Sequence, residues 1–286
     1  MALNKALLGK KFDPIPMTVD REQAKKYAMG SNDYDTWYLT EKGEGGAICP
    51  PMFAVVFAGP SFISPCFDSD LGVNFARLVH GSQDFTFHKP VRGGEEIATA
   101  SHIAGIEEKA SGDLLTIGFE SRDTKTKELV VSGQAQFFIR GGKKDAGAKK
   151  EEPKQEETRG QIVITNKMYV TKDQSYRYAE GSGDHNTIHV DPEFAKNVGL
   201  PGIILQGLCT MAFVQKAVVD EMCGGNPLKL KRLKCRFSKP VLPWEIVTTE
   251  GWIKEKKGKI TVLGLETKNQ DGAKVITDGL AEVETD

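Results

Sequence analysis

The chain has 286 residues, enough for two domains of ordinary size or one large domain. Its 39% hydrophobic and 27% charged residues suit a globular protein with a buried core, and its net charge of −1 gives no electrostatic reason to expect nucleic acid or an anionic membrane surface. No apolar run approaches the ~18 residues of a membrane helix, and no signal-peptide pattern opens the chain, so we expect a cytoplasmic protein without a membrane partner.

The first half carries an early helix signal. Asp20 and Gln23 form a D-x-x-Q pattern, which is typical of a capped helix N-terminus. The segment "YAMGSND" follows from Tyr27, and "FHKPV" begins at Phe87. Between these segments the chain is bulky and apolar, and we expect three phenylalanines there to pack in the core: Phe53, Phe57 and Phe62.

Residues 141–160 read "GGKKDAGAKKEEPKQEETRG" and contain no aromatic or branched aliphatic residue. Such a segment buries too little apolar area to offset the entropy of ordering it. It is therefore predicted to be a charged, flexible linker.

The second half begins with a predicted strand over residues 162–170 and a capped helix from Thr171 to about Glu180. A long helix, apolar nearly all round, is predicted from near Pro201 through "IILQGLCTMAFVQKAVVDEM". Four alternating strands follow, with turns at Lys257-Gly258 and Asp271-Gly272. A long buried helix followed by an antiparallel meander indicates an α+β layout, with the sheet wrapped around the helix.

The two halves repeat each other. "YAMGSND" and "YAEGSGD" begin at Tyr27 and Tyr178, an offset of 151, and the same offset pairs Gln23 with Gln174. "FHKPV" and "FSKPV" follow at an offset of 150. Three matches at nearly one offset indicate a duplicated domain. We therefore expect domains at residues 1–140 and 161–286, joined by the linker at 141–160.

The five cysteines form no C-x-x-C pair, and several lie in apolar runs such as "LQGLCTMAF". This pattern predicts buried free thiols in a reducing compartment rather than disulfides or a metal site. They are Cys49, Cys66, Cys209, Cys223 and Cys235.

The segment "GSGDHNTIHVD", residues 181–191, concentrates polar side chains. As a plain turn, it would use Gly181 and Gly183 for positive φ. Asp191 would then cap a short helix that has Pro192 at its first position. This interpretation leaves the remaining polar residues unexplained.

Two chemical interpretations compete for those residues. His185 and His189 have the spacing of a helical metal pair, but they follow Gly-Ser-Gly, no H-E-x-x-H is present and no cysteine is near. Alternatively, the carboxylate of Asp184 and the imidazole of His189 share one water and move its protons near neutral pH. Asn186 would orient that water. Acid–base chemistry is favoured, with His185 as a bystander.

"YAEGSGDHNTIHVDPEFA" resembles the signature of the type 2 (R)-specific enoyl-CoA hydratases and MaoC-like dehydratases, and "GLPGIILQGLCTMAF" resembles the family's next block. The resemblance covers essentially the whole chain and implies a tandem, or double, hot-dog fold. Thr187 replaces the family's usual proline, and Gln206 replaces the histidine before the helix glycine. The matching positions are Tyr178, Ser182, Gly183, Asp184, Asn186, Ile188, His189 and Ala195.

The resemblance implies that Asp184 and His189 hold the catalytic water and Asn186 orients it, while the N–H of Gly207 bonds the thioester oxygen. It implies hydration of a trans-2-enoyl-CoA to the (3R)-hydroxyacyl-CoA, or the reverse reaction. No metal or redox cofactor is expected, because the thioester already acidifies Cα. Coenzyme A is part of the substrate, and a homodimer is expected. Gln206 is expected close to the reacting group, where it would influence the substrate range or the rate.

The first half supplies Asp33, Asp35 and Tyr38 at the positions of Asp184, Asn186 and His189. Because the imidazole is lost there, we expect one active site per chain, with a degenerate first half that shelters the acyl chain.

The basic stretch "PLKLKRLKCRFSKP" offers cations for the phosphates of coenzyme A, or simply a solvated face of a strand. The candidates are Lys231, Arg232 and Lys234, with Lys229 and Arg236 beside them. Three other functions stay open: a (3R)-hydroxyacyl dehydratase acting on acyl carrier protein, a non-catalytic acyl-thioester-binding subunit, and a hot-dog thioesterase.

Overall fold

The computed structural model describes residues 3–40, 46–141 and 159–285. The linker predicted for residues 141–160 lies almost entirely outside these ranges. Within the described ranges, no helix is both long enough and apolar enough to cross a bilayer.

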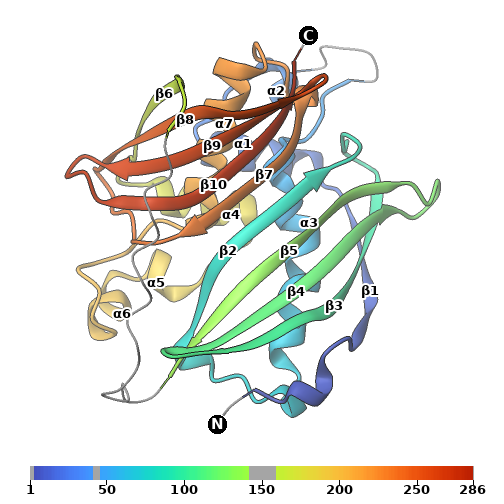
Figure 1. The fold of residues 1–286 in the computed structure, drawn as a ribbon, viewed down its shortest axis with the longest axis vertical. Helices are drawn as coiled ribbons and strands as arrows, with labels where there is room; N and C mark the ends of the chain where they lie inside the picture. The colour runs from blue at the N-terminus through green and yellow to red at the C-terminus, as the bar shows by residue number, and fades with distance from the viewer. Residues whose placement is uncertain (1–2, 41–45, 142–158, 286) are drawn as a thin grey trace.

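One antiparallel sheet of ten strands runs through the described residues in the order β1-β3-β4-β5-β2-β7-β10-β9-β8-β6. The first half supplies β1 (Lys11–Thr18), β2 (Leu78–Phe87), β3 (Glu96–Lys109), β4 (Gly112–Asp123) and β5 (Leu129–Arg140). The second half supplies β6 (Ile162–Tyr169), β7 (Leu230–Phe237), β8 (Ile246–Lys257), β9 (Ile260–Asn269) and β10 (Lys274–Glu284). Residues 82–86 of β2 pair with residues 232–236 of β7, so the strands of both halves form one layer (Figure 1).

Two central helices cover one face of this layer, α3 (Ala54–Ile63) over first-half strands and α7 (Gly207–Met222) over second-half strands. A sheet therefore wraps around a central helix once in each half, which confirms the predicted α+β, double hot-dog fold. The remaining α-helices are α1 (Arg21–Gly30), α2 (Thr36–Leu39), α4 (Gln174–Ser182), α5 (Thr187–Val190) and α6 (Pro192–Asn197).

Several local predictions are confirmed. Asp20 caps α1, since its carboxylate accepts the N–H groups of Glu22 and Gln23 at 2.7 and 3.1 Å. Asp191 caps α6 in the same way, with Pro192 at the first helical position. The five cysteines are all buried and free, and the three core phenylalanines are buried. Positive φ angles occur at Gly183, Gly258 and Gly272.

The predicted start of the long apolar helix near Pro201 is wrong, because α7 begins six residues later, at Gly207. The intervening chain is held extended by long-range bonds. The N–H of Ile204 donates to the carbonyl of Ile188 at 3.1 Å, and the N–H of Leu205 donates to the carbonyl of Val241 at 2.8 Å. Tertiary contacts thus override the helical propensity of this run.

The predicted capped start of α4 at Thr171 is also wrong, since the helix begins at Gln174 without a side-chain cap. The Thr171 hydroxyl instead donates to the Asp173 carboxylate at 2.6 Å. The Gln174 side-chain amide donates to the carbonyl of Gly30, at the end of α1. A contact between the halves therefore replaces the local capping box.

The helices α1 and α4 cross at equivalent glycines. A Cβ on Gly30 would lie 2.7 Å from the carbonyl oxygen of Arg177, and a Cβ on Gly181 would collide with the backbone of Tyr27. The predicted positive φ of Gly181 is therefore wrong, because this glycine is helical and serves close packing. The repeated segments that begin at Tyr27 and Tyr178 thus lie at the ends of the two helices that cross here.

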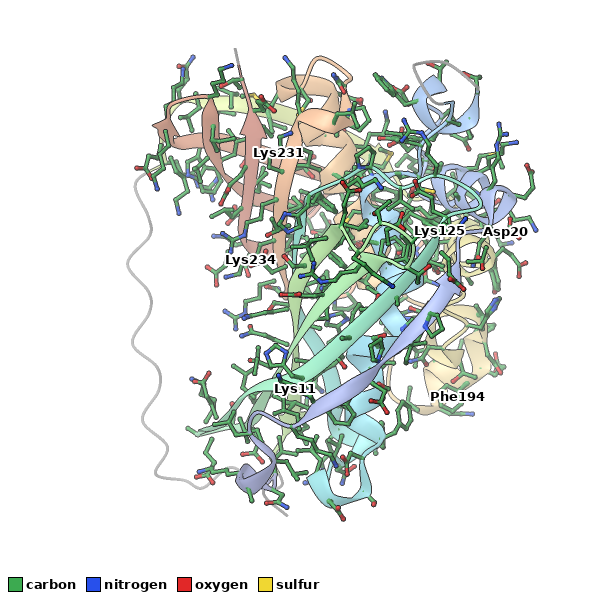
Figure 2. The ribbon with its side chains drawn as sticks, turned by 90° about the vertical axis from the view of Figure 1, so that its right-hand side faces the viewer. Lys11, Asp20, Lys125, Phe194, Lys231 and Lys234 are labelled. Carbon is green, nitrogen blue, oxygen red and sulfur yellow. The ribbon has the colours of Figure 1, made fainter. Side chains whose placement is uncertain are left out.

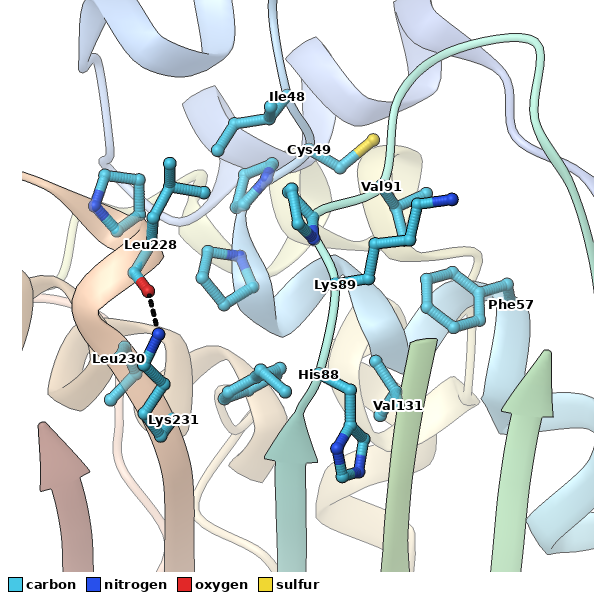
Figure 3. Close-up of a pocket in the computed structure, with 15 residues that line it drawn as sticks. Ile48, Cys49, Phe57, His88, Lys89, Val91, Val131, Leu228, Leu230 and Lys231 are labelled. Atoms are coloured by element: carbon cyan, nitrogen blue, oxygen red, sulfur yellow. Dashed lines mark hydrogen bonds between the residues drawn. The ribbon is translucent and has the colours of Figure 1, made fainter. Parts of the chain in front are cut away.

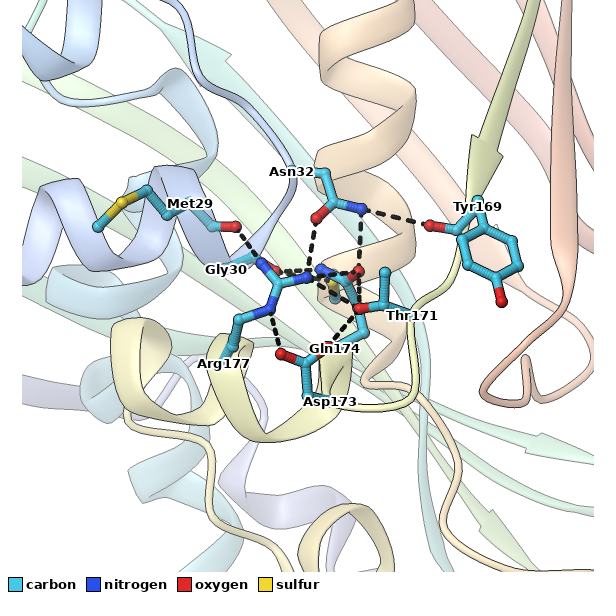
Figure 4. Close-up of polar contacts among 9 residues, drawn as sticks. Met29, Gly30, Asn32, Tyr169, Thr171, Asp173, Gln174 and Arg177 are labelled. Carbon is cyan, nitrogen blue, oxygen red and sulfur yellow. Dashed lines mark hydrogen bonds and ion pairs between the residues drawn. The ribbon is translucent and has the colours of Figure 1, made fainter.

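A polar cluster beside the crossing fixes α4 to α1 (Figure 4). The Arg177 guanidinium donates to the carbonyl of Met29 at 2.6 Å and to the side-chain oxygen of Asn32 at 3.0 Å. With the Gln174–Gly30 bond, these contacts join the first turns of α4 to the C-terminal end of α1. The chain that leaves α4 from this anchor is the segment expected to carry the chemistry.

Candidate active site

A cavity of about 830 Å³ lies between the two halves. The second half contributes the predicted catalytic residues Asp184, Asn186, His189 and Gly207 to its wall. The first half contributes apolar side chains from α3, among them Val56, Phe62 and Ile63. The structure therefore brings the four predicted catalytic positions together at one apolar cavity.

Asp184 follows the left-handed Gly183, whose φ of 78° ends α4 and turns the chain toward the cavity. The Ser182 hydroxyl oxygen accepts the N–H of Asp184 at 3.1 Å. The Asp184 carboxylate accepts the N–H of Asn186 at 3.3 Å. These short-range bonds hold the half-buried carboxylate on the cavity wall.

His189 lies on α5, a single turn capped by Asn186, whose side-chain oxygen accepts the N–H of Ile188 at 3.4 Å. Its Nδ1 lies 2.7 Å from the carbonyl oxygen of Ile204. Because a carbonyl only accepts, Nδ1 carries the proton, and Nε2 of the neutral ring keeps its lone pair. Burial lowers the pKa of the His189 imidazole, against the opposing effects of the nearby Asp184 carboxylate and the Ile204 carbonyl. The neutral ring is thus able to accept a proton from water.

Gly207 is the first residue of α7, which has no side-chain cap. The N–H of Gly207, at the first helical position, has no intrahelical acceptor, and the helix dipole adds positive potential there. A Cβ at Gly207 would lie 3.1 Å from the ring of Phe237, so glycine lets this ring close against the helix. The site therefore presents a donor suited to an oxygen that gains negative charge.

Gln206 is 1% exposed and is absent from the cavity wall. Its amide donates to the carbonyls of Ser175 at 3.0 Å and Asp184 at 3.3 Å. The substrate contact predicted for Gln206 is thus not found, because the side chain instead ties the backbone of Asp184 to α4. Its Oε1 is buried without a hydrogen-bond partner in the described structure.

The first half keeps the turn but not the chemistry. Asp35 caps α2 by accepting the N–H of Trp37 at 2.9 Å, as Asn186 caps α5, and Tyr38 is buried where His189 stands. The N–H of Cys49 donates to the carbonyl of Val91 at 2.7 Å, which matches the Leu205–Val241 bond of the second half.

This matched bond aligns Pro51 with Gly207, each two residues further along. Proline has no N–H. The first half therefore lacks the imidazole, and at Pro51 it lacks the N–H that Gly207 has in the second half.

A second cavity, of about 200 Å³, occupies the equivalent place in the first half (Figure 3). Residues 87–91 wall it, as their repeat partners 237–241 wall the larger cavity. Pro51 contributes to its lining, and Lys231 reaches it from β7. The smaller cavity is the structural counterpart of the larger one.

The cations predicted to bind phosphate do not line the larger cavity. Lys231 is 2.9 Å from the Glu284 carboxylate. Arg232 is 2.7 Å from Asp84 and 3.1 Å from Glu282, an ion-pair cluster that ties β7 to β2 and β10.

Lys234 lies on the sheet face away from the helices (Figure 2). The alternation of β7 turns Arg232 and Lys234 to this outer face. The prediction of phosphate contact therefore finds no support at these positions.

His80 of β2 lines the larger cavity and was missed by sequence reasoning. Its ring lies 4.9 Å from Phe137, 5.3 Å from Phe237 and 6.1 Å from Phe62, measured between centroids. Burial lowers the pKa of His80 to about 4, so the ring is neutral. A single histidine on an alternating strand gives no signal in a sequence, because only the pairing of β2 with β7 places it at this cavity.

Comparison with known proteins agrees with this architecture. Residues 153–273 match the model of the MaoC like domain, and residues 6–132 match the FAS1-like dehydratase domain region. A Dictyostelium discoideum protein named probable enoyl-CoA hydratase 2 is 28% identical and covers 98% of this chain and 96% of its own length.

Two solved structures share the fold. The MaoC-like dehydratase of Phytophthora capsici superposes with a TM-score of 0.81 at 22% identity, covering 100% of this chain and 99% of its own. A Mycobacterium tuberculosis protein with a double hotdog fold gives a TM-score of 0.60 at 11% identity, covering 97% and 96% of the two chains. Each half thus matches a dehydratase model: the chain carries a MaoC-like dehydratase domain in its second half and a FAS1-like dehydratase region in its first, within a double hot-dog fold.

Proposed function

We propose that the protein catalyses the reversible hydration of a trans-2-enoyl-CoA to the (3R)-hydroxyacyl-CoA. The observation that carries this proposal is the common cavity of Asp184, His189 and Gly207, whose other wall is apolar. The similarity to a protein named probable enoyl-CoA hydratase 2 supports the same reaction.

The proposed chemistry needs two proton transfers and one site for negative charge. Asp184 and His189 hold a water, and one of the pair takes its proton as the oxygen bonds to C3 of the enoyl group. The member that took this proton then delivers it to Cα on the same face, so that Asp184 and His189 return to their starting protonation states. Asn186 orients the water. Negative charge develops on the thioester oxygen, where the N–H of Gly207 and the dipole of α7 stabilise it.

The proposal needs no metal or redox cofactor, because the thioester itself acidifies Cα. It assigns residues 161–286 the catalytic role and residues 1–140 the shelter of the acyl chain, supported by the apolar residues of α3 on the cavity wall. A cytoplasmic homodimer is part of the same proposal.

Asp184→Asn and His189→Ala test the mechanism. Each should lower kcat for enoyl-CoA hydration by about 10³-fold, with the circular dichroism spectrum unchanged. His185→Ala is the matched control, since that neighbouring histidine is exposed and absent from the cavity wall. The assay follows loss of enoyl-thioester absorbance, with chiral analysis of the product.

Full hydratase activity in both variants would overturn the proposal. Release of free CoA from acyl-CoA without hydration would favour the thioesterase, and binding without turnover would favour the non-catalytic subunit. Relative rates on CoA and carrier-protein thioesters separate the hydratase from a carrier-protein dehydratase.

A further inference from the structure

The side chain of Gln215, on the second-half helix α7, is buried against the first half. Its Oε1 accepts the N–H of Met52, just before α3, at 2.7 Å, and its Nε2 donates to the carboxylate of Asp33 at 3.5 Å. These two neighbours fix the orientation of the amide, because an N–H only donates and an ionised carboxylate only accepts. Gln215 is thus a polar bridge from α7 to two segments of the first half.

The two groups that this amide joins have counterparts in the proposed active site. The repeat pairs Asp33 with Asp184. Met52 directly follows Pro51, which the aligned backbone bonds place opposite Gly207. The amide therefore stands between a carboxylate and the start of a helix, the two features that face the larger cavity in the second half.

Glycine takes the place of this amide in the other copy of the repeat. The alignment of α3 with α7 pairs two buried residues, Phe57 and Phe213. It also pairs Gln215 with Gly59, which lines the larger cavity. A Cβ on Gly59 would meet its nearest atom at 3.9 Å, so close packing is not what requires glycine there. A side chain from α7 thus fills the first-half position, whereas α3 places no side chain at the equivalent second-half position.

The bridge specifies where α7 lies along its axis. The Nζ of Lys216 lies 3.6 Å from the Asp33 carboxylate and 2.9 Å from Asp220, so an ion pair supports the same contact. Sliding α7 would leave a buried N–H and a buried carboxylate without their partners, which costs more than a shift between apolar surfaces. These directional contacts therefore hold the helix at one position.

That position is shared by the proposed thioester donor. Gln215 lies about 12 Å along the helix axis from Gly207, and α7 contains no proline between them. A displacement at Gln215 therefore moves the N–H of Gly207 as well. A displacement of about 1 Å at a reacting group can cost about 10²-fold in rate.

We infer that Gln215 is a positioning residue, which sets the place of the Gly207 N–H through its contacts with Met52 and Asp33. The first half thereby supports the reaction through residues that contact no substrate. This inference rests on the proposed function in taking the Gly207 N–H as the donor to the thioester oxygen. The anchoring of α7 depends on no reaction and is testable alone.

The kinetic test removes the bridge with little change in side-chain size. Gln215→Leu should lower kcat for enoyl-CoA hydration by about tenfold or more and change KM by less than about twofold, because the misplaced donor matters most in the transition state. Val219→Ala is the matched control, since Val219 is buried on the same helix and its apolar side chain makes no hydrogen bond. Its kcat should stay unchanged well below its unfolding midpoint.

Exchanging the two polar groups tests the bridge itself. Gln215→Glu places a second carboxylate beside Asp33 and should lower kcat at pH 8 at least as much as Gln215→Leu. Adding Asp33→Asn exchanges carboxylate and amide, so the new carboxylate accepts from both Met52 and the new amide. This double variant should recover kcat to within about threefold of the unmodified protein. If Gln215→Glu alone does not fold, the double variant is compared with Gln215→Leu, which adds no charge.

Three outcomes would overturn the inference: an unchanged kcat in Gln215→Leu, an equal loss in Val219→Ala, or no recovery in the double variant. Hydrogen exchange tests the anchor without substrate. The amides of α7 near Gly207 should exchange about tenfold faster in Gln215→Leu than in Val219→Ala, and equal exchange would show that Gln215 does not hold the helix. If the unmodified protein hydrates no enoyl thioester, the proposed function fails, and hydrogen exchange still decides the anchor.

Discussion

The hydroxyl oxygens of Tyr27 and Tyr178 lie 3.4 Å apart at the crossing of α1 and α4, and the internal repeat makes each residue the counterpart of the other. Their ring centroids are 5.3 Å apart, and both side chains are fully buried. The two copies of the repeat thus meet through the very residues that reveal it in the sequence. This crossing orients the end of α4, from which the Asp184 segment leaves.

We expect the crossing of α1 and α4 to require glycine at both Gly30 and Gly181. Gly30→Ala and Gly181→Ala should each lower the free energy of unfolding by about 1–3 kcal/mol, because a Cβ would meet backbone atoms that have no room to move. Gly202→Ala is the control, since a Cβ at that position would have no other atom within 4 Å. Urea denaturation measures the stability of all three variants. Equal unfolding midpoints in the two crossing variants and the Gly202→Ala control would show that α1 and α4 can move apart without loss of stability.

Gln206 is predicted to act as a positioning residue. Gln206→Leu should lower kcat by about tenfold or more with little change in KM, because two backbone carbonyls lose their donor and the Asp184 segment loosens. Gln206→His, which introduces the family's usual residue and retains a donor, should recover most of the rate. A rise in KM with unchanged kcat would instead indicate direct contact with substrate.

The first half is predicted to resist reactivation. In an Asp184→Asn background, Tyr38→His should restore no hydration, although it places an imidazole in the turn with Asp33. Pro51 stands where Gly207 supplies its N–H, and a proline has none to offer. Single-turnover assays compare the double variant with Asp184→Asn alone. Any gain in rate would show that the first half retains a working thioester donor.

We expect the buried carboxyl group of Asp33 to make the free energy of unfolding depend on pH. Burial raises the pKa of Asp33 to about 6, with the Lys216 ammonium opposing the shift. Between pH 4 and 6 the folded state therefore binds more protons than the unfolded chain, so the contribution of Asp33 to stability falls as pH rises through this window. Asp33→Asn removes this effect.

The unfolding free energy of Asp33→Asn relative to the unmodified protein should rise by about 3 kcal/mol between pH 4 and pH 7. His80 acts in the opposite sense, because its folded pKa of about 4 makes stability fall as pH drops. It is present in both proteins and cancels in the difference. Urea denaturation at the two pH values gives the comparison, and a constant difference would mean that Asp33 titrates alike in both states.

The sequence allowed prediction of features that short segments encode. The repeat offset reflects the crossing of α1 and α4, and the caps at Asp20 and Asp191 depend only on neighbouring N–H groups. The Asp184 segment was found because its residues are close in sequence as well as in space.

Other features depend on contacts between distant segments. The start of α7 is set by backbone bonds to Ile188 and Val241, and the role of Gly181 is set by Tyr27 in the other half. The basic stretch of β7 looked like a phosphate site because its carboxylate partners, Asp84 above all, lie far away in sequence. The place of His80 at the cavity could not be predicted either, because its neighbour Phe237 lies far away in sequence.

The continuous sheet has a consequence for solubility. Only β1 and β6 are edge strands of the sheet that the described residues form, and each is shielded against adding a foreign strand. Pro14 and Pro16 remove N–H donors from β1, while Glu221 of α7 accepts the N–H of Thr165 on β6 at 3.0 Å. Separating the two halves would uncover the paired edges of β2 and β7, which neither a proline nor a helix carboxylate shields in the described residues. Each hot-dog thus covers the sheet edge of the other, which protects both from pairing with a foreign strand.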